Sequence, residues 1–281
     1  MPTRKPVVLV AVSMDRASRV ALQRAHELAT ILRGELRVVH VASHRAAAAD
    51  ARPFRVSERT KSHKAAIQDW AAFETGIVLS ERRIHLRYGR VPAKVNAVAR
   101  AVDADLVVVG GRASHSSPAP GKKVEELIQR ATRPVMLASP TRDGDVLAAT
   151  DLEDETIPVV RAAADFARRV GRTVSLVHNV PFGTANLPLA LPRELTRQLT
   201  LGPLSKLERI VRSASVVEDA TVTSRESTAA AVLELARARE SDVLVLGAKS
   251  RLGRTLREVA DGAARSVLVV PEAFSARRRP S

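Results

Sequence analysis

The chain has 281 residues, 45% of them hydrophobic and 27% charged, which is the balance of an ordinary soluble globular protein rather than a disordered or fibrous one. It has no cysteine, which excludes disulfides and thiolate metal sites, and no apolar run near the roughly 18 residues of a membrane helix. The net charge of +15 is concentrated in residues 1–143, where 25 Lys and Arg face 13 Asp and Glu, and such an excess favours an anionic partner.

The predicted elements of the first half alternate strand and helix from the start. The nearly continuous apolar run at 7–12 is typical of a parallel strand covered by helices on both faces. Apolar residues at helical spacing predict a helix over 17–32, which Gly34 terminates. The remaining elements are predicted as a strand over 35–41, a helix over 61–75 with Ile67 and Trp70 inside, a strand over 83–87, a helix over 92–102, a strand over 105–110, a helix over 124–131 and a strand over 135–138.

The second half repeats this order after the segment 142–145, which we interpret as a linker. Its strands are predicted at 145–150, 173–180, 215–223, 242–247 and 266–270, and its helices at 157–170, 193–211, 228–239 and 254–264. The final stretch, 274–281, reads FSARRRPS and is predicted to be a loose basic tail.

The two halves are copies of one unit. The segment VVLVAVSMDRASRVALQRAHELA returns as DVLAATDLEDETIPVVRAAADFA, which sets Ser13 opposite Asp151, and LVVVGG matches VLVLGA at Gly110 and Gly247. An internal repeat of this size predicts a domain for each copy. We therefore expect one domain over 1–141 and a second over 142–281, the latter including the basic tail.

The alternation of strands and helices predicts the fold class. Right-handed crossovers between parallel strands produce a doubly wound α/β sheet, here with five strands in each domain and helices on both faces. In such sheets ligands bind beyond the carboxyl ends of the strands. His40 and His178 both end the second strand of their copy, where we predict packed, hydrogen-bonded imidazoles in preference to a role near the ligand cleft.

The loop after the fourth strand of each copy contains glycines and leads directly into a helix. A helix N-terminus offers unpaired amides and a positive dipole end to a phosphate. The loop reads GGRASHSSPAPGKKVEEL in the first copy and GAKSRLGRTLREV in the second. The alternative interpretation is that the glycines only end strands and begin helices, and that the basic side chains are solvated.

With these loops, the two copies resemble a tandem pair of universal stress protein domains over essentially the whole chain. The resemblance implies a Rossmann-like fold of the adenine nucleotide alpha hydrolase type and an internal pseudo-dimer that pairs through the last strands, VMLAS and VLVVP. Members that bind ATP have an Asp at the end of the first strand, backbone contacts to adenine after the second strand, and a phosphate loop G-x2-G-x9-G-[ST].

The resemblance assigns one set of candidate ATP-binding residues to each copy, and both sets depart from the motif. The first copy has a spacer of x7 before the last glycine, and its positions are held by Ser13, Val41, Gly110, Ala113, Gly121 and Lys122. The second copy has a spacer of x2, and its positions are held by Asp151, Asn179, Gly247, Ser250, Gly253 and Arg254, with Thr255 one place late.

These departures favour a non-catalytic stress-response module with degenerate nucleotide-binding loops. The lack of a membrane-length apolar run and of cysteine makes the cytoplasm its expected location. Two alternatives stay open: an ATP-binding sensor with weak or no hydrolysis, and an adaptor for acidic lipids or proteins through the basic first half. No catalytic residue is assigned, because G-x-S-x-G, H-E-x-x-H and G-x-G-x-x-G are all missing. Seven aromatic residues are too few for nucleic-acid stacking, and further dimerisation of the whole chain is left open.

Overall fold

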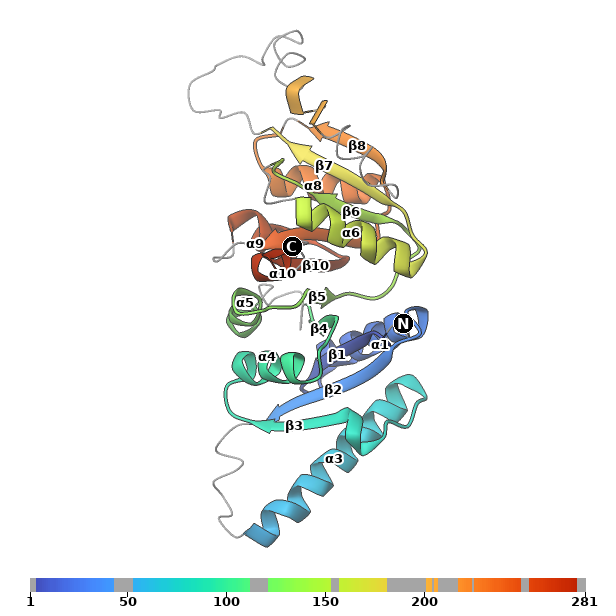
Figure 1. The fold of residues 1–281 in the computed structure, drawn as a ribbon, viewed down its shortest axis with the longest axis vertical. Helices are drawn as coiled ribbons and strands as arrows, with labels where there is room; N and C mark the ends of the chain where they lie inside the picture. The colour runs from blue at the N-terminus through green and yellow to red at the C-terminus, as the bar shows by residue number, and fades with distance from the viewer. Residues whose placement is uncertain are drawn as a thin grey trace. The chain divides into compact units, whose positions relative to one another are not determined.

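The computed structural model describes residues 4–42, 53–111, 121–152, 157–180, 201–203, 205–206, 217–223, 225–248 and 253–276. The chain divides into two compact units, residues 1–140 and 141–281, and each is described by itself (Figure 1). We refer to them as the first and the second domain.

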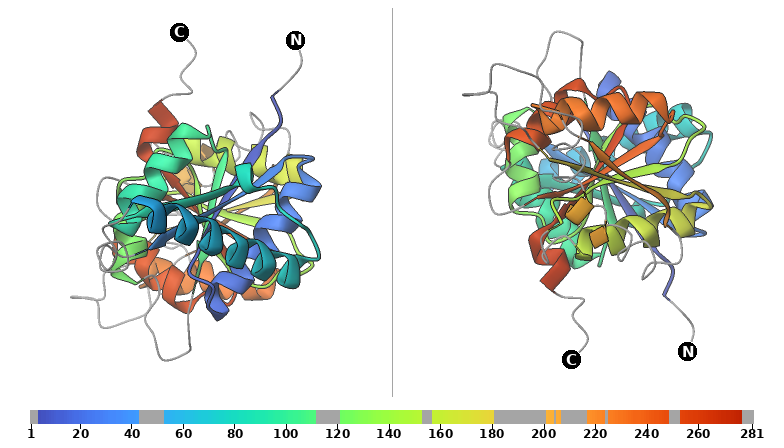
Figure 2. Two further views of the ribbon diagram at one scale, coloured as in Figure 1. Left: turned by 90° about the horizontal axis from the view of Figure 1, so that it is seen from below. Right: turned by 90° about the horizontal axis from the view of Figure 1, so that it is seen from above.

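The first domain contains five parallel strands in the order β3-β2-β1-β4-β5. Helix α3 lies beside β3 at the edge of this sheet, where it covers a strand that has only one neighbour (Figures 1 and 2). The elements are β1 (Val7–Val12), α1 (Arg16–Ile31), β2 (Glu35–Ala42), α3 (Pro53–Thr75), a 3-10 turn (Glu81–Arg83), β3 (Ile84–Tyr88), α4 (Val91–Ala101), β4 (Leu106–Gly110), α5 (Lys122–Gln129) and β5 (Val135–Ala138).

The second domain repeats this topology with parallel strands in the order β10-β9-β6-β7-β8. The predicted helix over 193–211 lies mostly outside the described residues. The elements are β6 (Val146–Ala149), α6 (Ile157–Val170), β7 (Val174–Asn179), β8 (Val217–Thr223), α8 (Thr228–Ala238), β9 (Val243–Ala248), α9 (Arg254–Gly262), β10 (Ser266–Pro271) and α10 (Glu272–Ala276).

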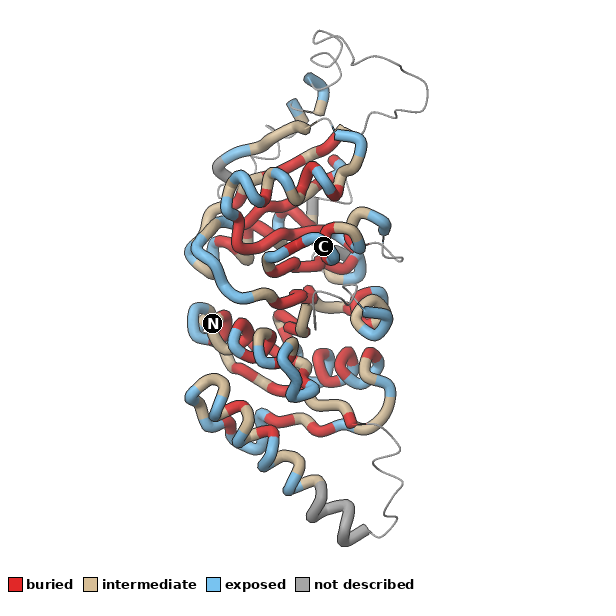
Figure 3. The backbone as a smooth tube through the Cα atoms, turned by 180° about the vertical axis from the view of Figure 1, so that it is seen from behind, coloured by how far each residue is buried: buried red, intermediate tan, exposed pale blue. Residues whose placement is uncertain are grey.

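Burial follows the predicted apolar pattern in both domains. Residues 7–10 of β1 are all buried, as expected for a strand between two layers of helices, and the buried residues gather on the strands and on the sides of the helices that face them (Figure 3). In α3, Ile67 is fully buried as predicted, whereas Trp70 is only partly buried. The α/β doubly wound class predicted for each half is confirmed.

The end of α1 differs from the prediction in detail. The residue with left-handed backbone is Arg33, at φ 49°, and the Gly34 N–H reaches back to the Ala29 carbonyl at 2.8 Å, the bond that closes a Schellman motif. Gly34 is needed for a different reason, since an added Cβ would lie 2.5 Å from the Pro6 carbonyl oxygen. In the second domain Gly171 takes the left-handed position, at φ 69°.

The C-terminal tail was predicted as loose from residue 274, and this is wrong for its first three residues. They belong to α10, which follows Pro271 and begins at Glu272. An acidic residue in the first turn of a helix interacts favourably with the helix dipole.

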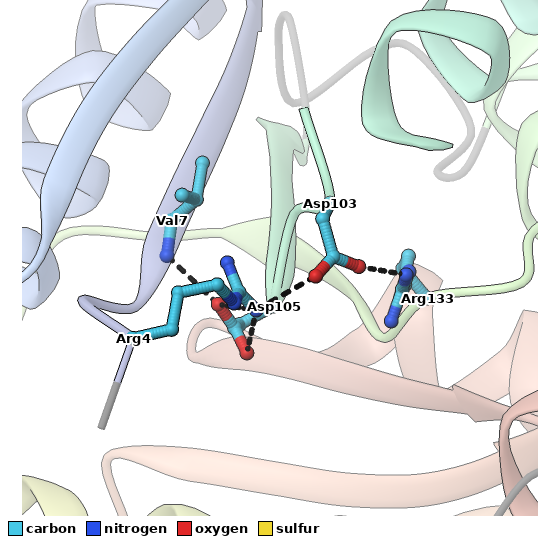
Figure 4. A network of polar contacts seen from close by, with 5 residues as sticks. All are labelled: Arg4, Val7, Asp103, Asp105 and Arg133. Atoms are coloured by element: carbon cyan, nitrogen blue, oxygen red, sulfur yellow. Dashed lines mark hydrogen bonds and ion pairs between the residues drawn. The ribbon is translucent and has the colours of Figure 1, made fainter. Parts of the chain in front are cut away.

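A polar network holds together the amino ends of the strands in the first domain (Figure 4). The Asp105 carboxylate accepts hydrogen bonds from the Val7 N–H at 2.8 Å and from the Arg4 guanidinium at 2.9 and 3.0 Å. Asp103 forms ion pairs with Arg4, at 3.3 Å, and with Arg133. This network stabilises the sheet at the amino ends of its strands, away from the carboxyl ends where ligands bind.

Candidate functional site

A cavity of about 390 Å³ lies in the first domain at the carboxyl ends of β1, β2 and β4. Its apolar wall includes valine side chains from these strands and from α4, namely Val12, Val39, Val41, Val91 and Val95. Its polar part comes from the turn between β1 and α1 and from the ends of the loop that joins β4 to α5. Both the position and the volume are those of a ligand site, since such sites measure about 300–1,000 Å³.

The turn between β1 and α1 brings Ser13, Asp15 and Ser18 together on this cavity. Asp15 is the N-cap of α1, and its carboxylate accepts the Ser18 N–H at 2.8 Å and the Ser13 hydroxyl at 2.7 Å. The Ser18 hydroxyl accepts the Ser13 N–H at 2.8 Å. Met14 has left-handed backbone, at φ 59°, as does Leu152 at the matching place of the second domain, so the turn is a property of the fold.

The Asp15 carboxyl is held in its charged form. Partial burial favours the neutral acid, but the hydrogen bonds from Ser13, from Ser18 and from the Ala17 N–H outweigh it and lower the pKa of Asp15. A carboxylate that stays ionised offers only acceptor sites, so it would recognise hydroxyl or amine donors on a ligand.

The loop between β4 and α5 contributes the other polar side of the cavity. An added Cβ on Gly110 would lie 2.8–2.9 Å from atoms of Ala17, so only glycine lets the end of β4 approach the first turn of α1 this closely. Gly121 is the N-cap of α5 and makes no side-chain cap, and Lys123 in the first turn lines the cavity. Among the described residues Lys123 has no ion-pair partner, so its charge and the helix N-terminus are available to an anion.

The structure brings together four of the six residues assigned to the first copy. The four that line the cavity are Ser13, Val41, Gly110 and Gly121. Lys122 begins α5 but is not among the lining residues, and Lys123 takes its place. Ala113 lies outside the described residues.

In the second domain the side chain of Asn179 is saturated by contacts within the protein. Its amide nitrogen donates to the Arg225 carbonyl at 3.0 Å and the Thr228 hydroxyl at 3.1 Å. Its amide oxygen accepts from the Thr223 hydroxyl at 3.0 Å and the Arg225 N–H at 2.9 Å. Since a primary amide has two donors and two acceptor sites, the buried Asn179 side chain has none left for a ligand.

The remaining candidates of the second domain lie along the same edge. Asp151 is exposed after β6, and Gly247 faces Val159 at the end of β9, with Ser250 outside the described residues. Gly253 and Arg254 begin α9, followed by the half-buried Thr255.

Arg254, the cation that begins α9, is paired with an acid of the same helix. The Arg254 guanidinium donates to Glu258 at 2.5 Å, and the Ser227 hydroxyl donates to the other oxygen of that carboxylate at 3.5 Å. The cation at the start of α9 therefore has an acidic partner in its own helix, whereas Lys123 in the first domain has no ion-pair partner among the described residues.

The prediction for the repeated histidines is confirmed. Nδ1 of His40 lies 2.9 Å from the Val12 carbonyl, and Nδ1 of His178 lies 2.9 Å from the Thr150 carbonyl. Because a carbonyl oxygen only accepts, Nδ1 is the protonated nitrogen in both rings. Each imidazole thus fastens the second strand of its domain to the end of the first.

Reading the sequence by motif position missed Asp15, Ser18 and Lys123. Asp15 stands two residues after the position where the motif has its acid, but it immediately precedes the helical pattern, which is the signature of an N-cap. That signal was available in the sequence. Lys123 had no such signal, because only the start of α5 decides which of two consecutive lysines faces the cavity.

A comparison with family models matches the universal stress protein family over residues 6–139 and again over 144–271. The chain belongs to the universal stress protein family. Solved structures of similar fold include a universal stress protein from Archaeoglobus fulgidus, with 14% identity over 95% of this chain and 98% of that chain at a TM-score of 0.64. Another is a protein of unknown function from Pseudomonas aeruginosa, with 16% identity over 97% of this chain and 95% of that chain at a TM-score of 0.65.

Other members of the universal stress protein family match about half of the chain. One from Archaeoglobus fulgidus was solved in complex with dAMP; it is 22% identical over 45% of this chain and 96% of that chain, with a TM-score of 0.36. A comparison with curated protein sequences gives no significant match. In the described part of the chain, no helix is both long and apolar enough to cross a membrane.

Proposed function

We propose that this universal stress protein is a non-catalytic stress-response module that binds ATP in its first domain. The cavity at the carboxyl ends of β1, β2 and β4 carries the proposal, because it combines an apolar wall with an anion site. Valines suit a base, and Lys123 at the start of α5 suits a phosphate. That the family includes a member solved with dAMP makes a nucleotide the first ligand to test.

One observation favours a single nucleotide per chain. The Arg254 guanidinium at the start of α9 donates to Glu258 of its own helix, whereas Lys123 of the first domain has no ion-pair partner among the described residues. The second domain therefore acts as a structural partner whose nucleotide loop is degenerate.

The polar groups of the cavity support binding better than hydrolysis. A general base works best when its pKa lies near the operating pH. Asp15 is the only carboxylate among the described lining residues, and its lowered pKa makes it a weak base. Pairing of the two domains through VMLAS and VLVVP, further dimerisation and a cytoplasmic location stay predictions.

ATP binding by equilibrium dialysis tests this proposal, with Lys123→Ala and, as a control, Arg254→Ala, which removes the cation at the first position of α9. We expect one ATP per chain, a loss of affinity of roughly tenfold for Lys123→Ala because one charge-assisted contact to phosphate disappears, and no change for Arg254→Ala. No ADP should form during the measurement. Failure of the wild type to bind, or two ATP per chain, would contradict the proposal.

A further inference from the structure

Two large apolar side chains protrude where α3 ends and the chain turns towards β3. Phe73, near the end of α3, is 83% exposed, and Val78, in the connection that follows, is 75% exposed. A single exposed apolar residue is ordinary on a protein surface, but two of this exposure only five residues apart favour an interaction site. The connection leads into the 3-10 turn that contains Arg82 and Arg83, and we call these four residues the α3–β3 corner (Figure 1).

The fold directs both apolar side chains outwards. In α3 Ala71 is fully buried, and Phe73, two residues later, lies about 200° further round the helix and so on the opposite face. In the connection, the Gln68 side chain donates a hydrogen bond to the Leu79 carbonyl at 2.7 Å, and the Leu79 side chain is buried. Because Leu79 takes the inward position, its neighbour Val78 is left in solvent.

Cations outnumber exposed acids around the corner. Residues 60–83 contain four cations and three acids, namely Lys61, Lys64, Arg82 and Arg83 against Asp69, Glu74 and Glu81. The Glu74 side chain is only 5% exposed and is paired with Arg19 at 2.8 Å, so it does not offset the charge of the surface. Arg83 pairs with Glu35 at 3.6 Å, but Arg37 pairs with the same carboxylate at 2.9 Å. These cations add to the positive charge of the whole first half of the chain, which attracts an anionic partner.

We propose that the α3–β3 corner docks the first domain onto the surface of an anionic lipid bilayer. Phe73 and Val78 enter the boundary between headgroups and acyl chains, and Arg82 and Arg83 contact lipid phosphates. A bilayer fits this corner better than a folded protein does, because fluid lipid surrounds protruding side chains whereas a protein must present a pocket for each. The corner shares no residue with the nucleotide cavity, so the inference does not depend on the proposed function.

Co-sedimentation of the full chain with vesicles tests the inference. The vesicles consist of phosphatidylcholine alone or of equal parts of phosphatidylcholine and phosphatidylglycerol. We expect binding to the mixed vesicles to be at least about tenfold tighter, since each basic residue near an anionic surface contributes about fivefold. Trp70, the single tryptophan, stands three residues before Phe73 on α3, and its emission should move to shorter wavelengths on the mixed vesicles.

Two variants remove the apolar and the charged contribution separately. Phe73→Gln should weaken binding to the mixed vesicles roughly tenfold, because an inserted apolar side chain is lost while glutamine still supports the helix. Arg82→Gln should weaken it about fivefold. The matched control is Arg130→Gln, which removes an arginine 62% exposed at the end of α5, ahead of β5 at the other edge of this domain's strand order, and should stay within about twofold of wild type. All three variants should keep the wild-type urea midpoint, because the side chains are exposed.

The inference is overturned if wild type binds neither kind of vesicle, or if Phe73→Gln binds the mixed vesicles as wild type does. Two other occupants of the corner would give results of their own. Dimers of wild type in sedimentation without lipid, together with monomers of Phe73→Gln, would show that the corner binds a second copy of the chain. Soluble poly-glutamate that displaces wild type from the mixed vesicles and does not bind Phe73→Gln would point to an acidic protein. Either result would replace the bilayer as the partner.

Discussion

Gly110 and Gly121 line the same cavity but differ in the space around them. An alanine Cβ at position 110 would meet backbone and side-chain atoms of Ala17 at 2.8–2.9 Å, whereas at position 121 it would meet nothing within 4 Å. We expect Gly110→Ala to lower the free energy of unfolding by about 1–3 kcal/mol, as overpacking does. Gly121→Ala should stay within about 0.5 kcal/mol of wild type, since φ is −66° there and no contact is made.

Urea unfolding of both variants measures this difference. The two substitutions add the same methyl group, so each is the other's control for changes in the unfolded chain. Equal unfolding free energies would contradict the close approach of β4 to α1. A ligand effect of Gly121→Ala without a stability effect would place the glycine against the ligand.

Asn179 stands where the family resemblance put a backbone contact to adenine, and its side chain ties β7 to β8 and to the start of α8. We predict that Asn179→Ala lowers the free energy of unfolding by about 1–3 kcal/mol, because Thr223 and Arg225 lose their partners at a buried site. ATP affinity should not change. A variant of unchanged stability and weakened ATP binding would show that this residue does contact nucleotide.

Single residues mark how far the sequence alone could predict the site. The motif spacing singled out Ser13 and Gly110, and both line one cavity, because each stands where a parallel strand ends. It missed Asp15, because the family pattern looks for an acid two positions earlier. The left-handed backbone at Met14 turns the chain so that Asp15 lines the cavity. The helical pattern over 17–32 attributed the end of α1 to Gly34, whereas the left-handed residue is Arg33.

The edge strand β8 is fastened by Arg239, which donates to Ser175 of β7 at 2.8 Å and to Asp219 and Thr221 of β8. The hydrogen bond from Arg239 lowers the pKa of Asp219 below its usual value, against a smaller opposing effect of burial. A group whose pKa is lowered on folding stabilises the protein above its unfolded pKa and loses that contribution as the pH falls through the folded value.

We therefore predict that Asp219→Asn lowers the urea midpoint at pH 7 and that its difference from wild type shrinks as the pH falls through the lowered folded pKa of Asp219. The loss at pH 7 should stay below about 1 kcal/mol, because the pair is half exposed and solvent screens it. The midpoints of wild type and variant should converge as the pH falls below about 4, where the unfolded carboxyl takes up its proton. A difference that does not shrink at all as the pH falls from 7 into the acid range would mean that something other than this charge is lost.

Elements were predicted best where burial alone decides them. The strands came from continuous apolar runs and agree with the structure to within two residues at each end, as at β5 (Val135–Ala138). Helix α3 begins at Pro53, whereas the predicted helix began near residue 61. The prediction missed the first turns because they contain few apolar residues and show no helical periodicity. The short helix α10 was taken as a tail for the same reason, since five residues are too few to show a period.

At the scale of the chain, the internal repeat was enough to predict two domains of one topology, which the two family matches and the two equal strand orders bear out. It could not predict which copy keeps a site. In the sequence, Asn179 and Val41 occupy the same position of the repeat. Only the structure shows that the Asn179 side chain is fully hydrogen-bonded within the protein and that Val41 lines a cavity. The second copy looked closer to the motif at Asp151, yet the cation that begins α9, Arg254, is paired with Glu258 of the same helix.

This asymmetry predicts that a nucleotide stabilises the two domains unequally. A ligand at about 100 times its Kd adds roughly 2.7 kcal/mol to the unfolding free energy of the unit that binds it. With ATP at that concentration, hydrogen exchange should slow in β1, β4 and α5, whereas β6, β9 and α9 keep their rates, because the ligand contacts only the former set. Lys123→Ala at the same ATP concentration should abolish most of the protection and supplies the control. Equal protection of β9 and α9 would mean that the second domain binds nucleotide despite its satisfied side chains, and the assignment of function to one copy would then be wrong.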